Sequence, residues 1–224
     1  EYRIVNYIYC LQLNILFFSL LKLNMIRISF IVIISLLTTS SFCQYNWNLE
    51  KDKNGIKVFS SAVPNSAFEA IKVEGNFTGS YSKLISILTN VPLFSTWIYH
   101  SKKSRVIQQY SPLEFIYHTE TEMPWPMSNR DAVIRLKIIT DSLPKFLIIT
   151  GRSEPGLVPL TPGLVRIKHY VADWKVTQVS NKTIHINYQV EVDPEGNVPG
   201  WIANMFVGKG PYESFSNLAK KLKE

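Results

Sequence analysis

Regular alternation of apolar and polar side chains over residues 183–192 is the feature that most restricts the fold of this chain. The sequence there is TIHINYQVEV, in which every second residue is apolar. A period of two is typical of a β-strand that buries one face. The same period appears in 113–123 and 131–139, so we expect a sheet with one apolar and one polar face. Further strands are predicted at 55–60, 67–77, 103–110, 145–152 and 164–178.

Helical spacing of apolar residues appears in fewer places. Residues 80–90 have this spacing, and Ser80 is in position to cap the first turn. A short helical turn is predicted to follow, from Pro92 to Trp97. These short helices are too few to cover a whole sheet.

The C-terminal segment, 198–223, is the longest amphipathic stretch of the chain. Gly208, Gly210 and Pro211 interrupt it, so we expect a kink, or a break at which Pro211 opens a second helix. An antiparallel sheet followed by one long helix is an α+β arrangement, in which the helix covers the inner face of the sheet. Space left between the two would form a cavity with apolar walls and a few polar groups.

The N-terminal part of the chain has the layout of a secretory signal peptide. A basic residue follows Met25, an apolar run occupies 28–37, and small residues come next. We therefore expect translation to start at Met25, cleavage to fall near Cys43 or Gln44, and the protein to be secreted or periplasmic. The alternative is a protein anchored in a membrane through its N-terminal apolar segment.

Residues 44–224 show no internal repeat and no linker, so we predict one domain there, preceded by a segment 1–43 that combines upstream sequence and signal peptide. Hydrophobic residues make up 46% of the chain, which excludes a disordered protein. Both cysteines, Cys10 and Cys43, lie before the predicted domain. No thiol chemistry is therefore expected in it.

Several short motifs follow one another in order from residue 47 to the C-terminus. They are Trp47 with Gly55-Ile56-Lys57-Val58, Trp97, Met123-Pro124-Trp125-Pro126 with Asn129-Arg130-Asp131, Arg166 with Trp174, and Asp193-Pro194-Glu195-Gly196-Asn197-Val198-Pro199 with Trp201 and Asn204. In this order they resemble the START (steroidogenic acute regulatory protein-related lipid transfer) domain family. The resemblance implies a helix-grip fold, a curved antiparallel sheet wrapped around a long C-terminal helix. The chain departs from the family at Glu195, where glycine is frequent, and in the family's N-terminal helix, which is reduced or missing.

The same motifs also have an architectural explanation. Pro124 and Pro126 fix the backbone and remove two amide donors, which ends a strand. Arg130 and Asp131 could form an ion pair that holds the following loop. The Asp193-Pro194 pair makes a turn that leads the chain into its last helix.

Residues with catalytic or metal-binding chemistry do not form a recognisable site. The four histidines, His100, His118, His169 and His185, lack metal-ligand spacing, and the chain has no G-x-S-x-G motif. Glu114, Glu120 and Glu122 share the parity of His118, so we expect this face of the strand to be exposed to solvent. The sequence therefore predicts no catalytic residue, no metal and no cofactor.

Basic residues exceed acidic ones, 24 to 17, which gives a formal net charge of +7. The tightest clusters, Lys102-Lys103-Arg105 and Lys220-Lys221-Lys223, contain no interleaved aromatic residues, so nucleic-acid binding is not expected. The excess of positive charge fits transient contact with a membrane surface better. We expect a monomer.

The predicted function is non-catalytic binding, and in addition transfer, of a lipid or other hydrophobic small molecule. One alternative is a polyketide cyclase-like or hydrolase-like enzyme on the same fold. Tyr117 and Tyr188 are the inward titratable groups that such an enzyme could use. Another alternative is an interaction module without a cavity. Strand alternation and helical spacing select the residues that would line the cavity. They are Phe115, Tyr117, Thr119, Leu136, Ile138, Tyr188, Val190, Trp201, Met205 and Phe206.

Overall fold

The computed structural model describes residues 45–64, 68–140 and 146–224. The predicted segment 1–43 and its cleavage site lie outside these residues. Fifteen elements follow one another in the described part. They are β1 (Asn48–Lys53), β2 (Ile56–Ala62), β3 (Glu69–Thr78), α2 (Tyr81–Thr89), η1 (Val91–Thr96), β4 (Ser101–Ser111), β5 (Glu114–Thr121), β6 (Arg130–Thr140), β7 (Phe146–Ser153), β8 (Val165–Arg166), β9 (Tyr170–Ser180), β10 (Thr183–Val192), α3 (Gly200–Asn204), η2 (Met205–Lys209) and α4 (Gly210–Lys221).

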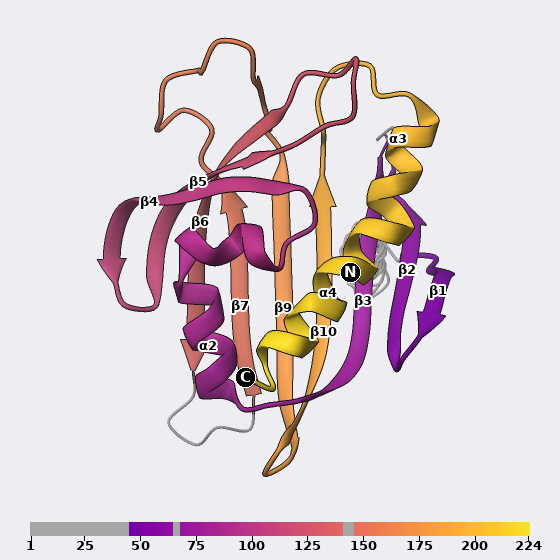
Figure 1. The fold of residues 1–224 in the computed structure, drawn as a ribbon, viewed down its shortest axis with the longest axis vertical. Helices are drawn as coiled ribbons and strands as arrows, with labels where there is room; N and C mark the ends of the chain where they lie inside the picture. The colour runs from indigo at the N-terminus through magenta and orange to yellow at the C-terminus, as the bar shows by residue number, and fades with distance from the viewer. Residues whose placement is uncertain (1–44, 65–67, 141–145) are drawn as a thin grey trace, which may run out of the picture. The chain divides into compact units, whose positions relative to one another are not determined.

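The strands of the described residues form one sheet in the order β1-β2-β3-β10-β9-β7-β6-β5-β4. Neighbours in this order are antiparallel, and the short strand β8 pairs in parallel with β6. Figure 1 shows the β4–β5 end of the sheet turned across the long central strands. The α+β fold with a curved antiparallel sheet is confirmed.

Two features of the sheet differ from the sequence prediction. The predicted strand 164–178 is divided into β8 and β9, because Arg166 turns its side chain into a buried ion pair before the chain enters the second strand. Strand β1 was not predicted, since its sequence NLEKDK has a single apolar residue and five of its six side chains are exposed. Edge strands of this kind lack an alternating signal.

Helix α2 begins as the sequence predicts. The Ser80 hydroxyl accepts a hydrogen bond from the Lys83 backbone N–H at 3.2 Å, which satisfies one free donor of the first turn. Leu84 and Leu88 lie one turn apart and are buried against the sheet. The following 3₁₀-helix η1 adds buried Phe94, so α2 and η1 cover part of the inner face together with the C-terminal helix.

The C-terminal helix is continuous and contains a π-helical turn. A π-helix, η2, joins α3 to α4, and the Gly210 N–H donates to the Met205 carbonyl five residues earlier. Pro211 lies at the start of α4 and has no N–H to donate back into this turn. The interruption predicted at this position is therefore a π-helical turn rather than a break.

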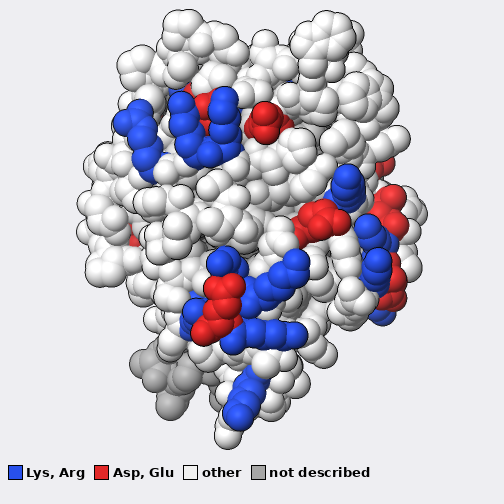
Figure 2. All heavy atoms as spheres, in the orientation of Figure 1, with Lys and Arg blue, Asp and Glu red and all other residues white. Residues whose placement is uncertain are grey.

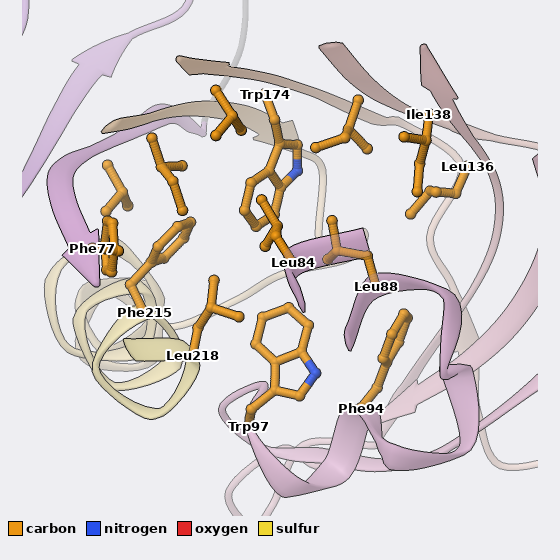
Figure 3. Packing of buried hydrophobic residues seen from close by; sticks show 14 of the residues in the cluster. Phe77, Leu84, Leu88, Phe94, Trp97, Leu136, Ile138, Trp174, Phe215 and Leu218 are labelled. Carbon is orange, nitrogen blue, oxygen red and sulfur yellow. The ribbon is translucent and has the colours of Figure 1, made fainter. Parts of the chain in front are cut away.

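Phe215 attaches α4 to the sheet. Its ring centroid lies 5.3 Å from that of Trp174 and 5.2 Å from that of Tyr188, with Phe77 at 6.1 Å. Figure 3 shows side chains from the sheet, α2, η1 and α4 meeting in this one cluster. We call the side of the sheet that faces these helices the inner face, and the opposite side the outer face.

Candidate functional site

Strand register aligns inward-pointing residues in rows across the inner face. One row is Phe115, Leu136, Gly151, Ala172 and Val190, and the next is Ile138, Ile149, Trp174 and Tyr188. Gly151 and Ala172 are the smallest members and lie in the middle of their row. The ring of Tyr170 covers Gly151 so closely that a Cβ atom there would lie 3.0 Å from its Cε1. Small residues at this point thus give an aromatic ring room to lie along the sheet.

Burial changes along β10. Ile184 and Ile186, at the end beside α4, are 0% exposed. Tyr188, Val190 and Val192 follow on the same face and keep part of their surface accessible. The inner face is therefore closely packed at one end and leaves side-chain surface accessible at the other.

Three tyrosines occupy this less closely packed end. Burial raises the pKa of Tyr117 and of Tyr188 well above the usual value of 10.0, and it also raises that of Tyr170. Tyr188 interacts with both of the others. Strands β5 and β10 are four positions apart in the sheet, about 19 Å if the sheet were flat.

Tyr170 was missed by the sequence analysis, although a signal was present. Tyr170, Ala172, Trp174 and Val176 alternate with polar or outward residues along β9. The prediction used only the overall range 164–178 and assigned no faces within it. Alternation read from the observed strand start would have placed Tyr170 on the inner face.

The ten predicted lining residues have three different environments. Phe115, Tyr117, Leu136 and Ile138 are buried on the inner face, and Tyr188 and Val190 are partly buried there. Thr119 is half-buried, and its hydroxyl lies 2.7 Å from that of Ser104. Met205 and Phe206 are half-buried in η2, where Phe206 packs edge-on against Tyr99.

Trp201 needs a correction. Its side chain is 54% exposed at the start of α3, whereas the sequence analysis placed it on the wall of an enclosed cavity. Helical spacing had grouped Trp201 with Ile202 and Met205. The structure buries Ile202 instead, because only one of two neighbouring helical positions can face the sheet.

The outer face of β5 also needs a correction. His118 and Glu120 were expected to be solvent-exposed, but they are only 6% and 4% exposed. His118 Nε2 lies 2.8 Å from Asp131 Oδ2, and Glu120 pairs with Lys102 and Lys103 at 3.2 Å each. Glu120 also accepts a hydrogen bond from the Asn129 side chain at 3.0 Å, so both buried groups have polar partners.

Asp131 pairs with Arg166 rather than with its neighbour Arg130. Arg166 donates from Nε and Nη2 to the two carboxylate oxygens at 2.9 and 2.8 Å, and its remaining donors reach the carbonyls of Pro155, Val158 and Pro159. Burial would raise the pKa of Asp131, but hydrogen bonds from Arg166 and His118 hold it below its usual value. This network fixes a loop and leaves no donor for a ligand.

Arg130 holds the connection between β10 and α3. Its guanidinium is 4% exposed and donates to the carbonyls of Pro194 and Glu195, both at 3.1 Å, and to that of Ser128 at 2.5 Å. Glu195 has a φ of 56°, the left-handed conformation that glycine adopts without strain. Arg130, for which the sequence suggested an ion pair with Asp131, therefore holds the segment leading into the C-terminal helix in place.

A pocket of about 120 Å³ lies on the outer face. Its lining consists of Tyr45, Trp47, Ala70, Val171, Asp173, Gln189, Val190 and Glu191. Pockets that enclose a drug-sized ligand measure about 300–1,000 Å³. The outer pocket is therefore too small to enclose a lipid.

Two other kinds of site were sought in the described residues. They contain no group of three or more His, Cys, Asp and Glu side chains that could hold a metal ion. No helix among them is long and apolar enough to cross a bilayer. Figure 2 shows basic side chains on one face in several separate groups, some of them beside acidic ones.

The curved sheet and the helix against its largely apolar inner face define a helix-grip protein. A family model for the START domain matches residues 40–224. The chain belongs to the START domain family, as the order of the sequence motifs had predicted.

Similar proteins come from bacteria and mammals. An uncharacterized protein of Pseudomonas aeruginosa is 27% identical over 174 residues, 77% of this chain and 85% of the relative. The phosphatidylcholine transfer protein of Mus musculus is 21% identical and covers 78% of this chain and 83% of its own length.

Solved structures share the fold. The STAR-related lipid transfer protein of Xanthomonas axonopodis superposes with a TM-score of 0.72 at 25% identity, over 80% of this chain and 99% of that one. Human StAR-related lipid transfer protein 5 gives 0.69 at 17% identity, over 89% and 95%. The helix-grip fold predicted from the sequence is thus confirmed.

Proposed function

We propose that the protein binds a lipid, or another hydrophobic small molecule, between the inner face of the sheet and the C-terminal helix. The end of β10 carries the proposal. Tyr188 is desolvated, yet Tyr188, Val190 and Val192 keep accessible surface on the inner face. Partly buried side-chain surface at this end of the inner face is available for contact with an apolar ligand. Apolar walls around it favour an apolar ligand, by about 0.8 kcal/mol for each buried methylene group.

The names of similar proteins support the same function. The Mus musculus relative is a phosphatidylcholine transfer protein, and the Xanthomonas axonopodis structure is that of a STAR-related lipid transfer protein. We extend both lipid binding and lipid transfer to this chain. The ligand is released unchanged in this proposal.

The buried tyrosines are suited to hydrogen bonding rather than to removing a proton from a substrate. Tyr117 and Tyr188 are the groups that an enzyme on this fold would use, and burial raises the pKa of both well above 10.0. Each therefore stays a neutral phenol near pH 7 and cannot serve as a general base. Neutral phenols can still donate and accept hydrogen bonds to a bound molecule.

Release of a lipid requires a contact with a membrane, and one end of the sheet suits such a contact. The connections that follow β5, β7 and β10 leave from this end. They carry Trp125 at 89% exposed, Leu160 at 73% and Trp201 at 54%. Lys103 and Lys168 lie at the same end, each 70% exposed and paired with a carboxylate, that of Glu120 or Glu195. Their exposed ammonium groups would also face anionic lipid headgroups.

Native mass spectrometry of the purified protein tests the binding proposal. We expect a co-purifying lipid, and after its removal we expect uptake of a fluorescent fatty acid or sterol at one molecule per chain. A chain that carries no lipid and takes up neither probe would contradict the proposal. Turnover of a bound compound would instead favour the enzyme.

Vesicle flotation tests the membrane contact. Trp125→Ser should lower recovery with anionic vesicles, because it removes an indole that inserts at the interface. Tyr110→Ser is the matched control, since Tyr110 is 49% exposed on β4 away from these loops. Equal loss in the two variants would contradict the assigned surface.

We further propose that the protein is secreted or periplasmic and acts as a monomer. The apolar run 28–37 supports the first part. N-terminal sequencing of the protein recovered outside the cytoplasm should start at Cys43 or Gln44, and size-exclusion chromatography with light scattering should give one chain per particle. An intact N-terminus in the membrane fraction would favour the anchored alternative.

A further inference from the structure

Several lysines gather at the end of the sheet where β10 begins. Gly79 joins the segments that carry them. Its N–H donates to the Lys182 carbonyl at 2.9 Å, and a Cβ atom on it would lie 3.1 Å from that of Leu222. The turn between β9 and β10, the start of α2 and the end of α4 therefore meet at this point. We call this surface the lysine end, and it consists of Lys83, Lys182, Lys220, Lys221 and Lys223.

The positive charge of the lysine end is largely unneutralised. The three segments that meet there, 76–86, 176–187 and 214–224, contain one acidic residue, Glu224, which pairs with Lys221 at 3.1 Å. The other four lysines form no ion pair within the part of the chain that the structure describes. Figure 2 shows a group of basic side chains toward the lower end of the molecule.

The helix dipoles explain only part of this charge. Lys220 and Lys221 lie in the last turn of α4, where a cation stabilises the helix. Lys83 lies in the first turn of α2, at the positive end of the helix dipole, where a cation is unfavourable. Lys182 lies in a turn between two strands. Because these like charges repel one another, an external anionic surface would stabilise this end of the protein.

The lysine end and the membrane contact proposed above lie at opposite ends of β10. This strand starts at Thr183, next to Lys182, and its other end leads toward Trp201. Its 10 residues, at about 3.3 Å each, separate the two ends by about 30 Å. Exposed charges interact over only about 8–10 Å at physiological ionic strength. The two ends therefore act independently, and binding at one leaves the other free.

The chemistry of the lysine end suits a layer of anionic lipids. Lysine ammonium groups are point charges on flexible stems and lack the directional fork of arginine. Each lysine near an anionic membrane strengthens binding about five-fold without requiring a fixed geometry. Val179, 57% exposed in the hairpin that carries Lys182, adds apolar surface beside them. An acidic protein partner would instead require fixed complementary positions, which flexible side chains from three elements do not define.

We propose that the lysine end attaches the protein to an anionic lipid layer, and that one molecule bridges two membranes, with Trp125 and Trp201 contacting the second. Bridging rests on the membrane contact proposed above, whereas attachment through the lysine end does not. A bridging protein would hold its ligand within one molecular length of both membranes.

Vesicle flotation tests the lysine end by itself. The starting protein is Trp125→Ser, in which the opposite contact is weakened, and the vesicles contain phosphatidylcholine with or without phosphatidylglycerol. Combining Lys182→Gln, Lys220→Gln and Lys223→Gln should lower its affinity for the anionic vesicles about 100-fold, the product of three single effects.

A second triple variant is the matched control. Lys53→Gln, Lys57→Gln and Lys137→Gln remove the same charge from exposed positions on β1, β2 and β6. Affinity for the anionic vesicles should fall less than about three-fold, since distant charges are screened. Thermal unfolding should be unchanged in both triple variants, because each removes exposed side chains only.

Vesicle clustering, measured by light scattering, tests bridging. The wild-type protein should cluster anionic vesicles, because its two ends contact different vesicles. Trp125→Ser and the variant with three substitutions at the lysine end should each cluster them less, while both still float with them through the remaining end. Added salt should abolish clustering before it abolishes flotation, since binding at the lysine end is electrostatic.

The outcomes separate this inference from the proposed function. Equal affinities of the two triple variants, or equal binding to neutral and anionic vesicles, would overturn the role of the lysine end and favour an acidic protein partner there. Flotation through both ends without clustering would overturn bridging. Clustering by a protein that takes up no lipid would contradict the proposed lipid binding and leave this inference standing.

Discussion

Arg166 and Asp131 form a two-pronged ion pair between the guanidinium and the carboxylate, with Nε–Oδ1 at 2.9 Å and Nη2–Oδ2 at 2.8 Å. Both side chains are at most 5% exposed. The pair joins β6 to β8, and through the carbonyls of Pro155 and Val158 it fixes the loop that follows β7. A buried charge pair of this kind specifies one position of a loop that has few apolar contacts of its own.

Removing the charge of Asp131 should destabilise the protein strongly. Asp131→Asn leaves Arg166 buried without a counter-ion, and we expect the free energy of unfolding in urea to fall by about 3 kcal/mol. The control is Asp173→Asn, since Asp173 pairs with Arg152 while both side chains are about half exposed. Its loss should be below about 1 kcal/mol. Equal losses would show that burial does not determine the strength of these pairs.

Acid should unfold the protein partly through Asp131. Burial opposes its ionised form, but hydrogen bonds from Arg166 and His118 lower the pKa of the folded carboxyl below its usual value of 3.8. The stabilisation is therefore complete above pH 3.8 and is lost as the pH falls through the lower pKa of the folded state. Unfolding free energies measured from pH 7 to pH 2.5 should fall more steeply in the wild type than in Asp131→Asn. Parallel curves would contradict the assignment.

Arg130 should control opening of the segment before the C-terminal helix. Arg130→Lys replaces a planar fork that reaches three carbonyls with a single ammonium. Loss of about 2 kcal/mol should speed amide exchange in 193–204 about 30-fold and leave β9 protected. Arg105→Lys, on the exposed strand β4, is the control. Uniform acceleration in both segments would indicate global destabilisation instead.

Two aromatic residues of the C-terminal helix should differ sharply in their contribution to stability. Phe215→Ala removes a ring that contacts Phe77, Trp174 and Tyr188, and should cost about 4 kcal/mol in urea denaturation. Trp201→Ala removes an exposed ring and should change stability by less than about 0.5 kcal/mol. A large loss in Trp201→Ala would mean that α3 is packed more tightly than its exposure indicates.

The sheet could be predicted from the sequence because the alternation that marks each strand lies within that strand. Alternation along β5 and β6 assigned Phe115, Leu136 and Ile138 to the inner face, where the structure has them buried. Ser80 marked a helix start through its hydroxyl, and Pro211 marked the π-helical turn through its missing N–H. Such signals need no knowledge of distant parts of the chain.

The outer face could not be predicted in the same way. His118 and Glu120 follow the polar parity of their strand, and they are buried among partners from other parts of the chain, Asp131 for His118 and Lys102, Lys103 and Asn129 for Glu120. The pairing of Arg130 with Asp131, in contrast, could have been excluded. Neighbouring residues of a strand point to opposite faces, which is why Asp131 meets Arg166 on one side and Arg130 reaches Pro194 on the other.

The π-helical turn at Met205–Lys209 holds one residue more than an α-helical path between the same ends would need. Deleting a single residue from 205–209 would therefore remove the π-helical turn and leave α3 facing as it does now, whereas an α-helical turn with the same number of residues would rotate α3 by about 100° about the axis of α4. Trp201 would then exchange places with a buried neighbour, so the hydrogen-bonding pattern of one turn, rather than side-chain chemistry, fixes which side of α3 is buried.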